Sequence, residues 1–120
     1  MAVRAIRGAT CLQADDPDEM TDAVVELLRA MLSRNGIDQD DLVSILFTAT
    51  PDLRCIFPAA AARSVGLADV PLMCAQEIDV AGALPRVVRV MAHADLAVPR
   101  SAVAHVYLRG AEALRQDIAQ

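Results

Sequence analysis

A few polar side chains stand inside otherwise apolar segments of this sequence. Arg7 interrupts VRAIRGAT, Arg89 interrupts VVRVM, Glu77 follows CAQ, and Tyr107, the only tyrosine, stands in HVYL. A charged side chain in a buried strand needs a partner or a ligand, because burying an unpaired charge is costly. Two interpretations follow. Glu77 forms a structural ion pair with Arg7 or Arg89, or the arginines bind an anionic ligand.

The sequence offers little for other kinds of chemistry. It contains no GxGxxG, no P-loop, no HExxH and no GxSxG. His93 and His105 have no partner pattern, so we expect each to be a packed or surface histidine. Cys74 has no base near it in sequence to activate a thiolate. We therefore expect no nucleophilic catalysis, no metal site and no cofactor.

Charge limits the classes of partner. The formal net charge is −5 and the sequence pI is about 4.8, so the chain repels nucleic acid and anionic lipid unless a local basic patch is present. All eleven cationic residues are arginine. Codon bias explains such a preference, and so do bidentate clamps on carboxylates, which lysine forms poorly. We expect no nucleic-acid or membrane partner.

Length and composition favour one domain that associates with copies of itself. The 120 residues fit a single domain, residues 1–120, and 55% of them are hydrophobic. Mean hydropathy is +0.36. A small monomer has too little interior for so much apolar surface, so some of it is expected to face another subunit.

Cysteine usage indicates a reducing compartment. Cys11, Cys55 and Cys74 are an odd number and form no CxxC pair, which argues against a disulfide framework and against zinc. The N-terminal segment lacks an apolar core of the signal-peptide type. We therefore expect a cytoplasmic protein.

The clearest predicted element is a long amphipathic helix. It follows the acidic turn at 15–19, repeats apolar residues from Met20 to Leu32, and ends at Asn35-Gly36. A short helix is predicted over 57–65, with Pro58 in its first turn. Strands are predicted over residues 2–12, 42–49, 71–78, 86–94 and 105–108, followed by a tail over 110–120.

This order predicts an α+β fold, with one sheet packed against one long helix and a short one. These two helices can cover only one face of the sheet, and they leave the other face open. Subunit association would cover that face.

Several segments together resemble one known family. They are AIRGAT (5–10), LFTATPDL (46–53), FPAAAAR (57–63), PLMCAQEIDVAGAL (71–84), RVM (89–91), HVYL (105–108) and LRQD (114–117). In this order, from residue 3 to about residue 117, they resemble the monofunctional chorismate mutases of the α/β-barrel type.

The resemblance implies a fold, an assembly and a reaction. It implies a mixed sheet in each subunit, a homotrimeric pseudo-α/β-barrel, and active sites at the subunit boundaries. It also implies a cofactor-free rearrangement of chorismate to prephenate in the biosynthesis of phenylalanine and tyrosine, with a mobile C-terminal tail over residues 110–120.

The resemblance assigns three catalytic residues and two further contacts. Arg7 matches an arginine that binds a substrate carboxylate, and Glu77 matches the carboxylate that meets the ring hydroxyl. Arg89 matches the arginine aimed at the breaking ether bond. Tyr107 matches a tyrosine at a carboxylate, and Arg115 matches the arginine of the tail.

Three more substrate-binding residues come from the same match. Phe57 and Arg63 match short-helix residues that line the pocket from a neighbouring subunit, and Cys74 matches a cysteine beside the substrate. The chain departs from the family in two places. Ala60 stands where some relatives carry lysine, and the loop SVGLADVP is one residue shorter.

These residue types suit a concerted rearrangement. One C–O bond breaks as one C–C bond forms, without proton transfer or a covalent intermediate. The protein must hold the dianion folded and stabilise charge that grows on the ether oxygen. Two alternatives remain open: a trimeric imine deaminase with a similar pseudo-barrel, and a non-catalytic small-molecule binding module on this scaffold.

Overall fold

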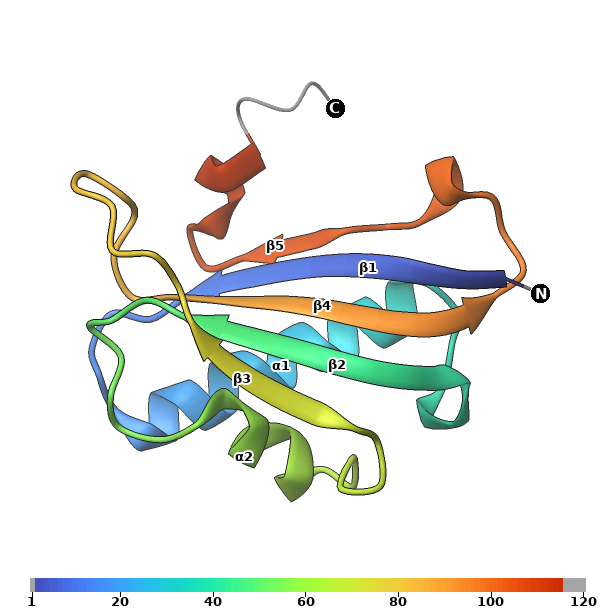
Figure 1. The fold of residues 1–120 in the computed structure, drawn as a ribbon, viewed down its shortest axis with the longest axis horizontal. Helices are drawn as coiled ribbons and strands as arrows, with labels where there is room; N and C mark the ends of the chain where they lie inside the picture. Colours follow the sequence, from blue (N-terminus) through green and yellow to red (C-terminus); the bar gives the residue numbers. More distant parts are fainter. Residues whose placement is uncertain (1, 116–120) are drawn as a thin grey trace.

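The computed structural model describes residues 2–115, and the strands form one mixed sheet (Figure 1). The strands are β1 (Ala2–Cys11), β2 (Leu42–Ala49), β3 (Leu72–Gln76), β4 (Val87–Leu96) and β5 (Val106–Leu108). Their order across the sheet is β3-β2-β4-β1-β5. β4 runs antiparallel to both β1 and β2, whereas the outer pairs β1·β5 and β2·β3 are parallel.

The long helix is α1 (Pro17–Arg34), and its ends follow from local sequence. The Asp16 side chain accepts a hydrogen bond from the Glu19 amide at 2.9 Å and caps the N-terminus. At the other end, Asn35 is the C-cap residue and Gly36 takes a φ of 62°, which glycine adopts at little cost. The predicted helix and its C-terminal boundary are confirmed.

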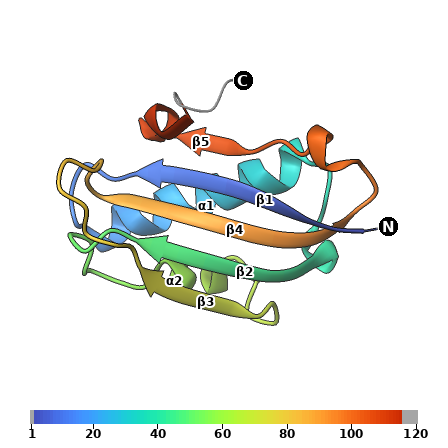
Figure 2. The same ribbon diagram turned by 45° about the horizontal axis from the view of Figure 1, so that its top comes forward.

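The two helices cover the same face of the sheet. α2 (Pro58–Ser64) packs beside α1 behind β2 and β3, and Figure 2 shows both helices on one side. The core between helices and sheet is fully apolar at its centre, with Ile6, Leu27 and Phe47 each 0% exposed. Gly8 lets α1 approach β1 closely, because a Cβ built there would lie 2.5 Å from the sulfur of Met31.

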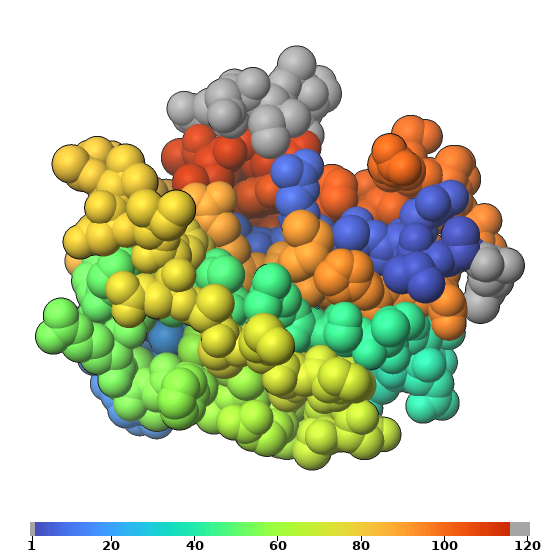
Figure 3. Space-filling model, viewed as in Figure 1, coloured from blue at the N-terminus to red at the C-terminus, as the bar shows by residue number. Residues whose placement is uncertain are grey.

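The opposite face of the sheet is open in this protomer, as Figure 3 shows from the front. Large apolar side chains stand exposed on it, including Val3, Leu46 and Met73. From Val88 to Leu96, β4 alternates between buried residues and more accessible ones. Because Arg89 belongs to the accessible set and its side chain is 50% exposed, the expectation that it is buried is wrong. A strand covered on one face buries only every second residue.

The α+β class and the mixed sheet are confirmed, and the predicted elements have the correct order, with ends shifted by two residues at most. Three short 3₁₀ helices were not predicted: η1 (Gln39–Asp41), η2 (Arg100–Ala102) and η3 (Ala111–Arg115). η3 takes up the first part of the predicted tail, and residues 116–120 lie outside the described residues. Within residues 2–115, no helix has the length and apolar character that crossing a membrane requires.

Candidate active site

Strand register brings the candidate residues together on the open face. Arg89 pairs with Ala9 on one side and with Thr48 on the other, and Ala9 pairs with Tyr107. Directly paired residues place their side chains on the same face of a sheet. Tyr107, Ala9, Arg89 and Thr48 therefore form one row across four strands. Arg7, two residues before Ala9, lies on the same face in the next row.

A cavity of about 410 Å³ opens along this row. Arg7, Arg89 and Tyr107 line it, together with Leu114 from η3. The rest of the lining is apolar apart from Thr48, and comprises Gly8, Ala9, Leu46, Val90 and Met91. Three of the residues predicted from sequence are thus brought to one cavity.

Glu77 holds the Arg89 side chain through a single nitrogen. The Nε atom of Arg89 lies 3.2 Å from Oε1 and 3.1 Å from Oε2 of Glu77. The carboxylate also accepts a hydrogen bond of 2.6 Å from the Thr48 hydroxyl. Glu77 is only 16% exposed, whereas Arg89 is half exposed. The ion pair between Glu77 and Arg89, one of the two sequence interpretations, is therefore present.

This pairing leaves part of the Arg89 guanidinium for a ligand. Among residues 2–115, its two terminal Nη groups donate no hydrogen bond, and no hydrogen bond or ion pair holds the Arg7 guanidinium. Both arginines line the same cavity. The ion pair and a ligand site are therefore compatible, and the two interpretations of these residues do not exclude one another.

Tyr107 and Arg115 form a second contact at the edge of this cavity. The guanidinium carbon of Arg115 lies 4.8 Å from the centre of the Tyr107 ring, and Nη1 lies 3.4 Å from the phenol oxygen. A cation over an aromatic face is attracted by the ring quadrupole. η3, which follows β5 after one short turn, supplies Arg115. The contact brings a third guanidinium beside the cavity.

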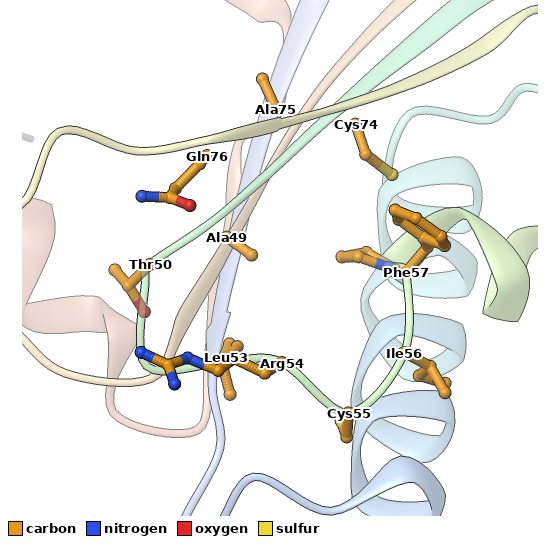
Figure 4. Close-up of a pocket in the computed structure, with 11 residues that line it drawn as sticks. Ala49, Thr50, Leu53, Arg54, Cys55, Ile56, Phe57, Cys74, Ala75 and Gln76 are labelled. Carbon is orange, nitrogen blue, oxygen red and sulfur yellow. The ribbon is translucent and has the colours of Figure 1, made fainter.

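Phe57 and Cys74 lie at a different cavity of about 330 Å³, shown in Figure 4. Cys74 pairs with the buried Phe47 in β2, so its side chain faces the helix side of the sheet. In Figure 4 the Cys74 side chain points toward Phe57. Phe57 is the N-cap residue of α2 and is 69% exposed. These two residues do not line the cavity of Arg7 within one protomer.

Arg63 stands apart from both cavities. It lies in the last turn of α2 and is exposed to solvent. Within residues 2–115 its side chain makes no hydrogen bond or ion pair. The predicted residues therefore form two groups in one protomer. One group lies on the open face, and the other lies at the α2 edge of the sheet.

Two residues of this region were not selected from the sequence. Thr48 supports Glu77, and the sequence held no signal for it, because only the strand register places it beside Arg89. The Nδ1 atom of His105 accepts a hydrogen bond of 2.9 Å from the Arg7 amide. Burial lowers the pKa of His105, and the nearby positive charges of Arg7 and Arg115 lower it further. His105 stands two residues before Tyr107, and residues two apart in a strand lie on the same face. This spacing was the sequence signal that could have identified His105.

Electrostatically, the open-face cavity suits a ligand with more than one negative group. Arg7 and Arg89 provide fixed cations inside it, and Arg115 lies at its edge. Glu77 carries the negative charge that faces Arg89. Guanidinium groups remain charged at any physiological pH. These charges are of the kind that can bind, orient and polarise a dianion.

Comparison with known proteins identifies close relatives. The family model described as chorismate mutase type I matches residues 3–118. A protein of Thermus thermophilus named chorismate mutase AroH is 47% identical over 117 residues, which are 97% of this chain and 96% of that protein. A protein of the same name from Bacillus subtilis (strain 168) is 40% identical over 119 residues, 98% of this chain and 94% of that protein.

A solved structure agrees with these matches. It is described as chorismate mutase from Clostridium thermocellum Cth-682 and superposes with a TM-score of 0.89 at 44% sequence identity. The match covers 91% of this chain and 97% of that chain. Sequence and fold therefore point to the same relatives over nearly the whole length.

Proposed function

The chain belongs to the chorismate mutase type I family, and from this premise we propose how its open-face cavity rearranges chorismate to prephenate. It is an isomerase that acts on chorismate. Arg7, Arg89 and Glu77 form the catalytic set, with Tyr107 and Arg115 at a substrate carboxylate. The observation that carries the proposal is the shared cavity of Arg7, Arg89 and Tyr107.

Substrate binding rests on the unpaired cation at Arg7. A dianion entering the cavity meets the Arg7 guanidinium, which has no carboxylate partner among residues 2–115. A charge-assisted hydrogen bond between guanidinium and carboxylate is among the stronger contacts that proteins make. Arg115, held over Tyr107, lies at the edge of the same cavity for the second carboxylate. Two anchors restrict the flexible side chain of the substrate and favour the folded, reactive conformation.

Catalysis rests on the fixed orientation of Arg89. Glu77 engages only Nε, so both Nη groups are directed elsewhere and can donate to the ether oxygen as negative charge develops there. Glu77 also remains able to accept a hydrogen bond from the ring hydroxyl. One such preorganised donor lowers a barrier by about 3–4 kcal/mol. Enzymes in general lower theirs by at least about 8 kcal/mol, so conformational restriction supplies much of the remainder.

The direct test follows the ultraviolet absorbance of chorismate with purified protein. We expect chorismate to disappear far faster than in buffer and prephenate to be the sole product. The same protein should have no activity on 2-imino acids. Absence of chorismate turnover, or turnover of imino acids instead, would overturn the proposal.

We also propose that the working form is a homotrimer whose sites lie between subunits. The open face carries exposed apolar residues such as Leu46 and Met73, which association would cover. The α2 edge presents an exposed Phe57 and an Arg63 that has no ion-pair partner among residues 2–115. In this arrangement, Phe57 and Arg63 of one copy complete the cavity on the open face of the next. Native mass spectrometry should show a species near three times 12.8 kDa; monomer alone at micromolar concentration would exclude it.

Mixed trimers test where the two groups of residues meet. Arg89→Ala and Arg63→Ala proteins, each of low activity, are unfolded together at equal concentration and refolded. If a site takes Arg89 from one copy and Arg63 from the next, about one quarter of the sites regain both arginines. If both arginines act within one copy, no site regains both and activity stays at the average of the two parents.

Cytoplasmic location is part of the same proposal. All three cysteines, Cys11, Cys55 and Cys74, are free thiols in this fold. Free thiols persist in reducing compartments.

A further inference from the structure

The junction between β1 and β5 contains a hydrogen bond of unusual type. The amide of Arg7 donates to Nδ1 of His105 at 2.9 Å, one residue before the strand pairing of Gly8 with Val106 begins. An amide of a paired strand ordinarily donates to a backbone carbonyl. Here the imidazole replaces that carbonyl, so a side chain holds the β5 side of the Arg7 backbone, while pairing with Met91 of β4 holds the other side.

The hydrogen bond fixes the protonation state of the ring. An Nδ1 atom that accepts a hydrogen bond cannot carry a proton, so the neutral form with the proton on Nε2 is required. Burial lowers the pKa of His105 from its ordinary value of 6.5, and the charges of Arg7 and Arg115 add to this effect. The surroundings therefore favour the ring form that the geometry needs.

The groups that face His105 reinforce the same preference. His105 lines a cavity of about 400 Å³ with Arg4 and Arg7 from β1 and Arg100 from η2. β4 contributes the uncharged Met91, and the remaining lining is Val3 and Ala5. No carboxylate is among these lining residues. A proton on His105 would add one more positive charge to a group of arginines.

We propose that neutral His105 is a positioning residue for Arg7, holding the backbone of the arginine that binds a substrate carboxylate. This inference rests on the proposed function, because the proposed function assigns Arg7 the role of binding a substrate carboxylate. His105 itself touches no substrate. When His105 takes up a proton, its hydrogen bond to the Arg7 amide is lost, and Arg7 is held only from the β4 side, so its guanidinium is less well positioned at the cavity.

The direction of the pH effect follows from the lowered pKa. The unfolded chain binds a proton on this histidine as the pH falls through about 6.5, whereas the folded chain binds it only at lower pH. The stabilising contribution of His105 is therefore present above about pH 6.5 and is lost as the pH falls through its folded pKa. Affinity for chorismate should weaken in that acidic range by a larger factor than kcat falls.

Two substitutions separate the hydrogen bond from the titration. His105→Asn keeps an acceptor at the position of Nδ1 but does not titrate, and His105→Leu removes the acceptor. We expect KM of the wild type to rise below pH 6.5, KM of His105→Asn to stay level, and KM of His105→Leu to be raised about fivefold or more at every pH. At pH 7.5 the rise in KM of His105→Leu should exceed the fall in its kcat, because Arg89, which the substitution does not touch, still faces the ether oxygen.

His93→Asn is the matched control. His93 is the only other histidine, lies on the same sheet opposite Ala5, and bonds the Ser44 hydroxyl at 3.2 Å. This variant should keep the KM of the wild type and its rise at acidic pH. If His105→Leu has an unchanged KM, or if His93→Asn abolishes the acidic rise, the proposal is wrong.

A spectroscopic measurement tests His105 without any activity. Nitrogen-15 spectra of the imidazole rings should show an unprotonated Nδ1 at pH 7.5 for the signal that His105→Leu removes. A protonated Nδ1 there would overturn the proposal. An unchanged KM in Arg7→Ala would instead overturn the role of Arg7 in the proposed function, and would leave the ring assignment intact.

Discussion

Replacing Arg89 by citrulline removes its charge and keeps its shape and most of its hydrogen bonding. If Arg89 stabilises the ether oxygen, kcat should fall about a hundredfold or more while KM and the assembled protein remain. If Arg89 serves only to neutralise Glu77, the loss should appear in the free energy of unfolding. The two roles therefore predict different measurements.

The structure sets the size of the stability effect. Burying an unpaired carboxylate completely would cost about 3–5 kcal/mol. The Arg89 side chain is half exposed, however, and Glu77 keeps its hydrogen bond of 2.6 Å from Thr48. A solvent-accessible ion pair contributes about 0–1 kcal/mol. We therefore expect unfolding to become easier by no more than about 1 kcal/mol, against a rise of about 3 kcal/mol in the catalytic barrier.

Arg109 provides the matched control. Its Nε lies 2.9 Å from Oε1 of Glu26, and the two side chains are 35% and 50% exposed, away from the residues that line the cavity. Citrulline at Arg109 should change stability by a similar small amount and leave kcat unaltered. Initial rates of chorismate loss and urea denaturation supply the measurements for both variants.

Two results would refute this account. A near-normal kcat in the Arg89 variant would show that its positive charge does not lower the barrier. A loss of several kcal/mol in the free energy of unfolding, with kcat reduced only by the unfolded fraction, would show that the ion pair with Glu77 is its whole role.

Three further predictions concern pH, the C-terminal segment and the core. We expect kcat to stay nearly constant from about pH 6 to pH 9 and to survive dialysis against EDTA, because the rearrangement transfers no proton and guanidinium groups stay charged over this range; a bell-shaped kcat profile or inactivation by EDTA would contradict this. Truncation after Gly110 removes Arg115 from Tyr107 and should raise KM more than it lowers kcat, so an unchanged KM would show that Arg115 is not a ligand. Gly8→Ala should reduce the free energy of unfolding in urea by about 1–3 kcal/mol, because its Cβ would lie 2.5 Å from the sulfur of Met31; an unchanged midpoint would mean that Met31 moves aside without cost.

The elements of this fold could be predicted from sequence because each has local signals. The repeat from Met20 to Leu32 and the Asn35-Gly36 end defined α1 correctly. The position of β1 between β4 and β5 has no such signal. Strand neighbours are chosen by packing between segments distant in sequence, which periodicity within one segment does not report.

Arg7, Arg89 and Glu77 were selected because charged side chains in apolar segments are conspicuous, whereas the family resemblance alone made candidates of Phe57, Arg63, Cys74 and Arg115. The exposure of Arg89 was misjudged. Val87, Val88 and Val90 around Arg89 suggested burial on both faces, whereas only one face of β4 is covered. Similarly, Cys74 could not be assigned to a face of β3 until the register paired it with Phe47. Sequence identified which residues to consider, and strand pairing decided which of them share a cavity.

The position of β1 between β4 and β5 also constrains how this chain folds during synthesis. β1 emerges first, yet its pairing partners are β4 and β5, so that Ala2 lies opposite Leu96. The ribosome must therefore release nearly the whole chain before β1 can form a single strand pair. Pairings between such distant segments form slowly, because a long loop must close before any contact is gained. Until then β1 keeps both edges unpaired, and we expect a nascent or truncated chain without β4 to depend on chaperones and to aggregate in their absence.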